Sequence, residues 1–94
     1  MRDDEFEWDD AKTAANLARH GVSFDTVTLA FDDPHAMVRD DFRERYGEDR
    51  YALLGMVSDK LFYVAYTLTG DRIRIISARG AEPYERRLYQ KANS

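Results

Sequence analysis

The chain has 94 residues, 44% of them hydrophobic, with five Phe, six Tyr, one Trp and a net charge of −4. This composition excludes a disordered chain, and the length favours a single domain that spans residues 1–94. The absence of Cys excludes disulfides, thiolate metal sites and a Cys nucleophile. The acidic start lacks a signal-peptide pattern and no apolar run is long enough to span a membrane, so we expect a cytoplasmic protein.

The first elements are predicted from alternation and from capping residues. Residues 5–8 alternate polar and apolar, which predicts a short, half-buried strand. Asp9 is placed to cap a helix over residues 10–20, and Gly21 is placed to end that helix in the left-handed conformation.

A second helix is predicted directly after the first. Ser23 is its candidate N-cap, residues 24–31 form an apolar-faced helix, and Asp32-Asp33-Pro34 stops it. Two helices joined by two or three residues would form a helical hairpin.

The remainder of the chain predicts a meander of strands and a last helix. Residues 35–41 form a short strand or an ordered loop, and the charged residues 42–49 form a loop. Turn residues at 58–60 and at 70–71 separate three strands, over residues 50–57, 61–69 and 72–79. Pro83 begins the final helix, in which Tyr84, Leu88 and Ala92 share a face. The expected fold class is α+β, a small antiparallel meander sheet with an N-terminal helical hairpin and a C-terminal helix.

Charge is divided unevenly along the chain. Residues 1–49 hold six Lys or Arg against fourteen Asp or Glu, whereas residues 50–94 hold eight against four. The net charges of −8 and +4 indicate either an acidic solubilising half or a basic half that contacts a polyanion, and the asymmetry alone does not choose between them.

Four strings resemble the BrnT family of toxins. They lie in the family's order and together cover nearly the whole chain. The first string runs from Phe6-Glu7-Trp8-Asp9 and Lys12 through Asn16-Leu17 to His20-Gly21-Val22-Ser23-Phe24; the second is Phe31-Asp32-Asp33-Pro34; the third is Gly47-Glu48-Asp49-Arg50; the fourth is Gly70-Asp71-Arg72-Ile73-Arg74-Ile75-Ile76-Ser77-Ala78-Arg79, followed by Ala81, Glu85-Arg86 and Tyr89. Gly80 and Pro83 depart from the family, which often has basic or polar residues there.

The resemblance implies a RelE-like fold and a toxin of a type II toxin–antitoxin pair. Such a toxin cleaves RNA, inhibits translation and is neutralised by a BrnA-like ribbon-helix-helix antitoxin. Promoter DNA would be contacted only through the toxin–antitoxin complex.

Cleaving RNA without a metal requires a base, cations that stabilise the phosphorane and an acid for the leaving oxygen. We expect no metal and no cofactor, because the sequence has no dense cluster of Asp and His. Arg50, Arg74 and Arg79 are the candidate cations, since a guanidinium stays charged and can hold two phosphate oxygens. Arg50 opens one strand and Arg79 closes another, so adjacent strands could bring them to one edge. In a regular strand Arg74 and Arg79 would point to opposite faces, unless a bulge near Ile75-Ile76 reverses the register.

The remaining candidates have weaker support. The catalytic set adds a possible carboxylate base or orienting group, Glu48, and two possible proton donors or acceptors, His20 and Tyr89. The candidate RNA contacts are Lys12, Asp49, Tyr66, Arg72 and Arg86. For each candidate the alternative is structural: solvated loop carboxylates, a helix-end histidine, arginines that cover a sheet face, and core packing for Tyr66.

Two other functions remain open at this point. A domain of the same fold could be a non-catalytic, partner-binding or regulatory subunit. A DNA-binding regulator is less favoured, because the chain lacks a recognition helix. We expect Arg50→Ala and Arg79→Ala to relieve toxicity while leaving the fold intact.

Overall fold

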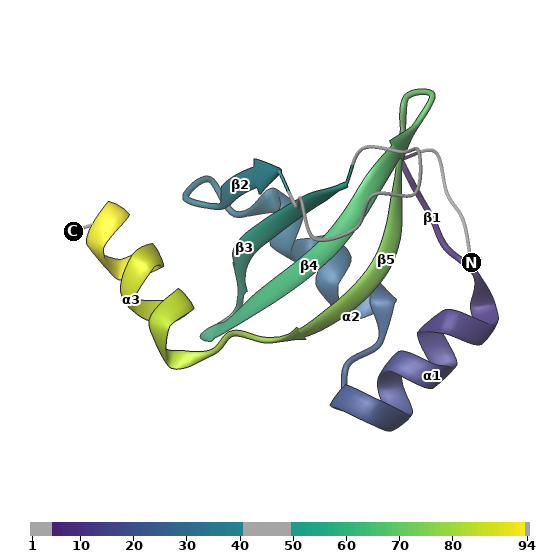
Figure 1. Cartoon of the computed structure of the whole chain (residues 1–94), viewed down its shortest axis with the longest axis horizontal. Helices are drawn as coiled ribbons and strands as arrows, with labels where there is room; N and C mark the ends of the chain where they lie inside the picture. The colour runs from purple at the N-terminus through teal and green to yellow at the C-terminus, as the bar shows by residue number, and fades with distance from the viewer. Residues whose placement is uncertain (1–4, 41–49, 94) are drawn as a thin grey trace.

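A computed structural model describes residues 5–40 and 50–93 (Figure 1). Its centre is a five-stranded sheet in the order β1-β5-β4-β3-β2. The strands are β1 (Phe6–Glu7), β2 (Met37–Asp40), β3 (Tyr51–Val57), β4 (Lys60–Thr69) and β5 (Arg72–Gly80). The antiparallel meander from β2 to β5 agrees with the predicted α+β class, but β1 pairs parallel to β5, so the sheet is mixed.

Helix α1 (Asp10–His20) has the predicted bounds and the predicted caps. The Asp9 carboxylate accepts the backbone N–H of Ala11 at 2.8 Å, and Gly21 has φ +71°. Both ends of α1 are therefore determined by residues adjacent in sequence.

The predicted short second helix occupies the expected residues but is only partly α-helical. Helix α2 (Phe24–Val27) is a single turn, followed by a 3-10 helix, η1 (Thr28–Asp32). The Ser23 side chain caps no backbone N–H, and the Thr28 hydroxyl donates to the carbonyl of Asp25 at 2.8 Å. The helical hairpin is therefore not confirmed, because only one turn of this segment is α-helical and the rest is a 3-10 helix.

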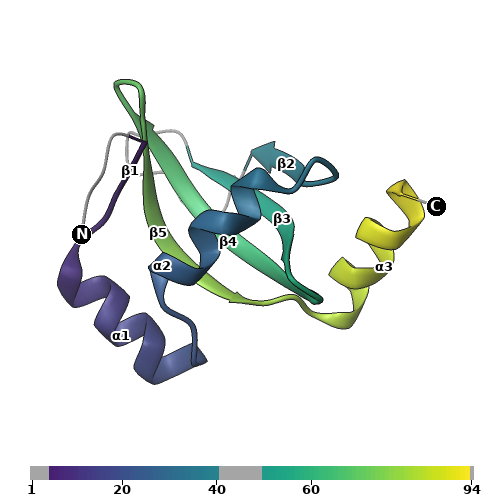
Figure 2. The same cartoon turned by 180° about the vertical axis from the view of Figure 1, so that it is seen from behind.

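The main core lies between the sheet and the layer formed by α1, α2 and η1 (Figure 2). The buried side chains come from both layers; they are Phe6, Trp8, Val22, Phe24, Val27, Phe62, Val64, Ile75 and Ala78. Gly55 of β3 is buried where η1 crosses the sheet, and a Cβ at this position would lie 2.6 Å from the carbonyl oxygen of Ala30. The close contact of η1 with β3 therefore requires glycine.

Asn16 joins α1 to the outer edge of β5. Its side-chain amide donates to the carbonyl of Ala78 at 2.8 Å and accepts the N–H of the same residue at 3.1 Å. Strand β1 pairs with Ile73 and Arg74, so the buried Asn16 satisfies the β5 backbone farther along, where β1 has ended.

Strand β5 contains a bulge at Ile76. Ser77 pairs with Ala65, and Ile75 pairs with Tyr66, so Ile76 is the extra residue. The condition under which Arg74 and Arg79 would share a face, a bulge near Ile75-Ile76, is therefore met. Residues 72, 74, 77 and 79 consequently share one face of the sheet.

Helix α3 (Pro83–Ala92) begins at the predicted proline but turns a different face inward. Tyr84 and Leu88 are exposed, whereas Glu85 is fully buried and Tyr89 is half-buried. Tyr84 and Leu88 share one side of the helix as predicted, but this side is exposed, and the helix turns Glu85, which is paired with Arg79, toward the protein. Among the described residues, no helix is both long and apolar enough to cross a membrane.

Candidate functional site

The face of the sheet opposite α1 and α2 is called here the open face; Figure 1 views it from the front. The bulge at Ile76 places three arginines of β5 on it: Arg72, Arg74 and Arg79. Helix α3 packs over one end of this face, against Leu54, Leu61 and Ala81. The arginines thus divide into a group far from α3 and a group beside it.

The group far from α3 is centred on Arg74. Its Nη1 donates to Glu7 Oε2 at 2.9 Å, and the two side chains are 41% and 11% exposed. Arg74 pairs with Thr67, and Tyr51 pairs with Tyr66, so the antiparallel register continued by one residue puts Arg50 level with Thr67. The backbones of Arg50 and Arg74 are then two strands apart, about 10 Å.

Arg72 lies two residues before Arg74 and adds a further cation to this group. Its Nη1 is buried and has no hydrogen-bond partner among the residues that the structure describes.

Arg79 lies beside α3 and is held by the protein itself. Its Nη1 and Nη2 donate to Glu85 Oε1 and Oε2 at 2.8 and 3.0 Å, Nη1 also donates to the carbonyl of Gly80, and the guanidinium stacks 4.2 Å from the ring centre of Tyr63. Burial acts against the charge of Glu85, but hydrogen bonds from Arg79 and from the N–H of Glu82 outweigh it and lower the pKa of Glu85. The same pair raises the pKa of Arg79.

Two expectations about Arg79 need correction. Arg79 on β5 pairs with Tyr63 on β4, which pairs with Leu54 on β3. Arg79 is therefore level with Leu54, four residues beyond Arg50 in the sequence. At about 3.3 Å per residue, Arg50 and Arg79 are separated by roughly 13 Å along the strands and do not meet at one edge. Nor is Arg79→Ala expected to leave the fold intact, because it would leave the buried Glu85 carboxylate without its partner.

Tyr89 is also held by an internal partner. Its hydroxyl donates to Asp33 Oδ2 at 2.6 Å, and the N–H of Met56 donates to the same oxygen at 2.8 Å. Burial and this hydrogen bond raise the pKa of Tyr89 to about 12. Tyr89 therefore ties α3 to the end of η1, and its proton is not poised for transfer near neutral pH.

Tyr66 points to the helix-covered face and is buried there. Its ring packs edge-on against Phe31 at 5.1 Å between centres and lies 5.5 Å from Tyr51. Burial raises the pKa of Tyr66. This position matches the core-packing alternative for Tyr66 and separates its ring from the open face.

The other predicted residues are not brought together. Lys12 and His20 are exposed at the two ends of α1, and Arg86 is exposed on α3. Glu48 and Asp49 lie outside the described residues. Within residues 5–40 and 50–93, no three His, Asp or Glu side chains are grouped as metal ligands.

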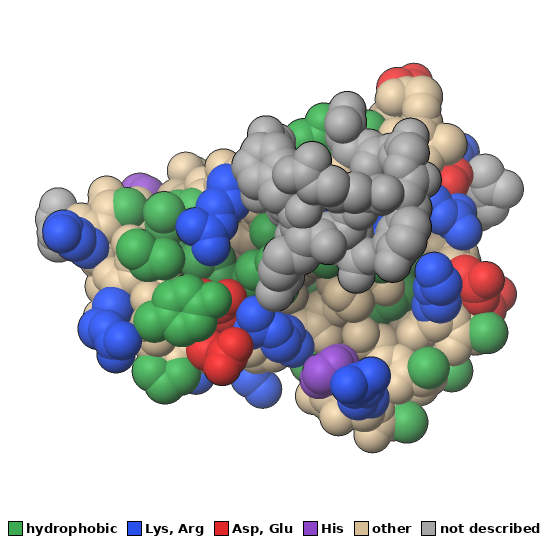
Figure 3. Space-filling model, in the orientation of Figure 1, with side chains coloured by type: hydrophobic (Ala, Val, Ile, Leu, Met, Phe, Trp, Pro, Cys, Tyr) green, Lys and Arg blue, Asp and Glu red, His purple; other side chains and the backbone are tan. Residues whose placement is uncertain are grey.

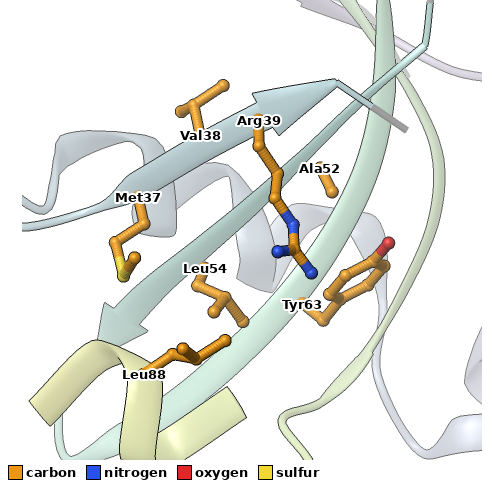
Figure 4. A pocket seen from close by; sticks show the side chains of 7 residues that line it. All are labelled: Met37, Val38, Arg39, Ala52, Leu54, Tyr63 and Leu88. Atoms are coloured by element: carbon orange, nitrogen blue, oxygen red, sulfur yellow. The ribbon is translucent and has the colours of Figure 1, made fainter. Parts of the chain in front are cut away.

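A pocket of about 60 Å³ lies between α3 and the sheet (Figure 4). The lining residues come from β2, β3, β4 and α3; they are Met37, Val38, Arg39, Ala52, Leu54, Tyr63 and Leu88. Arg39 points toward Tyr63 across it. Sequence reasoning missed Arg39, although alternation within residues 37–40 would have put it on the same face as Met37.

Sequence reasoning also missed Glu7 and Glu85 as the partners of Arg74 and Arg79. Glu7 lies in an alternating strand beside Phe6 and Trp8, which was a signal that it faces away from the core. Glu85 had a local signal as the N3 acid of a helix capping box, in which it accepts the N–H of Glu82, but its pairing with Arg79 on another element had none.

Comparison with known proteins agrees with the resemblance. A family model described as the ribonuclease toxin BrnT of type II toxin–antitoxin systems matches residues 8–85. A search of curated proteins finds no match. The matched region holds α1 to β5, the arginines of the open face and the start of α3, so the chain belongs to the BrnT family of ribonuclease toxins of type II toxin–antitoxin systems.

Proposed function

We propose that this chain is a single-domain, metal-independent endoribonuclease with a RelE-like fold that cleaves RNA on its open face and thereby inhibits translation in the cytoplasm. A BrnA-like ribbon-helix-helix antitoxin neutralises it, and promoter DNA is contacted only through the complex of the two proteins. The family match supports a ribonuclease activity and an antitoxin partner for this chain.

The observation that carries the proposal is the bulge at Ile76. It turns Arg72 and Arg74 toward the open face, near the level of Arg50. Two guanidinium groups on β5 and a third just before β3, two strands away, suit a chain of phosphates, because a guanidinium can donate two parallel hydrogen bonds to phosphate oxygens. Glu7 supports Arg74 from the adjacent strand and limits the orientations of its guanidinium.

In the proposed reaction a 2′-oxygen of RNA attacks the adjacent phosphorus, and the bond to the 5′-oxygen breaks. The products are a 2′,3′-cyclic phosphate and a free 5′-hydroxyl. Arg74, with Arg50 and Arg72, stabilises the negative charge that grows on the phosphoryl oxygens. We assign the removal of the 2′-proton to Glu48, which lies two residues before Arg50 in sequence. A water molecule supplies the proton that the leaving 5′-oxygen takes up.

Arg74→Ala tests this assignment directly. Removing one charge-stabilising donor typically costs about 10²–10³-fold in rate, so kcat/KM on an end-labelled RNA should fall by this factor. Arg74→Lys should recover only part of the loss, since Lys cannot make the paired hydrogen bonds. Arg19→Ala, at the exposed end of α1, is the matched control and should keep full activity.

Two results would contradict the proposal. Cleavage by Arg74→Ala at the rate of the unmodified chain would contradict the assignment of the arginine site. Loss of activity in EDTA that returns with a divalent ion would contradict metal independence. If the unmodified chain binds its antitoxin but leaves RNA intact, the alternative function, a non-catalytic partner-binding subunit, would be supported instead.

A further inference from the structure

An apolar surface runs across the pocket beside α3 and is built from two separate elements. Tyr84 and Leu88 of α3 are 47% and 39% exposed, four residues apart and therefore on one side of the helix. Met37 and Leu54 supply the sheet side of the pocket next to Leu88 (Figure 4). In Figure 3 hydrophobic side chains gather over α3 and toward β2. We call the pocket wall of Met37, Leu54 and Leu88, together with the exposed Tyr84 four residues before Leu88 on α3, the α3 groove.

Cations border this groove. Arg39 of β2 is exposed and reaches over the pocket, and the exposed Arg87 precedes Leu88 on α3. The acidic side chains of α3 are engaged elsewhere, because Glu85 is bonded to Arg79 and Glu82 lies 3.7 Å from the same guanidinium. Figure 3 shows Lys and Arg side chains at the margins of the hydrophobic surface.

We propose that the α3 groove is the docking site for a segment of the antitoxin that inserts an aliphatic side chain beside Leu88 and places acidic side chains against Arg39 and Arg87. This inference rests on the proposed function, which supplies the partner. A protein segment fits better than RNA because an aliphatic pocket favours an apolar side chain and would leave a phosphate poorly solvated. Acidic neighbours would complement the bordering cations and speed association.

Leu88→Arg is the test, measured as the Kd of the purified chain for the antitoxin encoded beside it. The substitution puts a charge into the apolar pocket yet costs the fold little, since Leu88 is already partly exposed. We expect the Kd to rise at least tenfold. Leu17→Arg, the same change at an exposed leucine of α1, is the matched control and should bind as the unmodified chain does.

A second variant tests the proposed contact between acidic side chains of the antitoxin and Arg39. Arg39→Glu should weaken binding, and the loss should shrink as salt is raised from 0.1 to 0.5 M, because rim charges are screened. Thermal unfolding of each variant confirms that it is folded.

RNA cleavage by Leu88→Arg without antitoxin separates this proposal from the proposed function. Unchanged cleavage with weakened antitoxin binding supports the docking site. Binding at the unmodified affinity overturns it, and so does loss of cleavage with normal antitoxin binding, which would make the groove an RNA site. If the unmodified chain cleaves no RNA, the proposed function fails, but the Kd comparison still decides the docking site.

Discussion

Arg74 and Arg79 lie five residues apart on one strand and in different surroundings. Arg74 is the more exposed and is oriented by one carboxylate, whereas three of the five N–H donors of Arg79 are used by Glu85 and by the carbonyl of Gly80. Arg74 can therefore hold a phosphate and keep its partner. Arg79 chiefly anchors α3 to β5.

Arg79→Ala should lower the free energy of unfolding by about 3 kcal/mol, because it leaves the buried Glu85 carboxylate without its partner. This value is at the low end for a buried ion pair, since the Arg79 side chain is 26% exposed. Arg74→Ala should cost less than about 1 kcal/mol, since its pair with Glu7 is more exposed. Urea unfolding at pH 7 measures both. Equal losses for the two variants would contradict the different roles assigned here.

Glu85 also predicts a response to acid. Its pKa is lowered in the folded chain, so its contribution to stability is present above the unfolded pKa of about 4.3 and is lost as pH falls through the lower, folded value. Glu85→Gln, compared with the unmodified chain in urea between pH 7 and pH 2, should remove part of the acid destabilisation. A Glu85→Gln chain with the same pH profile would show that the ion pair does not stabilise the fold.

Tyr89 predicts the opposite sign at alkaline pH. Because its pKa is raised to about 12 by burial and by Asp33, its contribution is complete below the unfolded pKa of about 10 and is lost as pH rises toward 12. Tyr89→Phe should lower the free energy of unfolding by about 1–2 kcal/mol at pH 7 and by almost nothing above pH 12. Stability curves of the two chains that stay parallel from pH 9 to pH 12 would contradict the contact with Asp33.

At the scale of elements, the contact between η1 and β3 depends on the absence of a side chain at Gly55. A methyl group there would meet the backbone oxygen of Ala30 at 2.6 Å, so η1 would have to move away from the sheet.

Gly55→Ala should therefore destabilise the chain by about 1–3 kcal/mol, the usual cost of overpacking. Gly80→Ala is the matched control at the same level of the sheet, two strands away, since its new methyl group would meet only the Lys60 side chain at 3.9 Å. Denaturation midpoints compare the two variants. A tolerated Gly55→Ala would mean that η1 is not packed against β3 as described.

At the scale of the molecule, a chain of net charge −4 presents several arginines on one face of its sheet. The uneven division of charge along the sequence thus becomes a division in space, because β5 and the residue before β3 supply cations to the open face.

This arrangement predicts that RNA binding weakens with salt. For single-stranded RNA each neutralised phosphate contributes about 0.7 to the slope of log K against log salt, so contacts by Arg50, Arg72 and Arg74 give a slope of about −2. A 2′-O-methyl RNA, which lacks the attacking hydroxyl, allows binding to be measured without cleavage. Arg74→Ala should reduce the slope by about 0.7, and Arg19→Ala should leave it unchanged.

The features that could be predicted from the sequence are mainly those set by contacts between residues close together in the chain. Asp9 and Gly21 determine α1 through contacts within a few residues, and turn residues separate β3, β4 and β5 near their observed ends. The four strings identified the family, and the arginine pattern indicated a bulge near Ile76 as the condition for a shared face.

The tertiary structure decided the rest, since it depends on partners distant in sequence. Packing of Ala30 against Gly55 accompanies the tighter winding of η1, and the ion pair with Arg79 turns Glu85, rather than Leu88, toward the protein. Strand register separates Arg50 from Arg79 and joins Glu7 to Arg74 across 67 residues. Local sequence determines where elements begin and end, but which side chains meet is set by how the elements pack, because burial and pairing act across the whole chain.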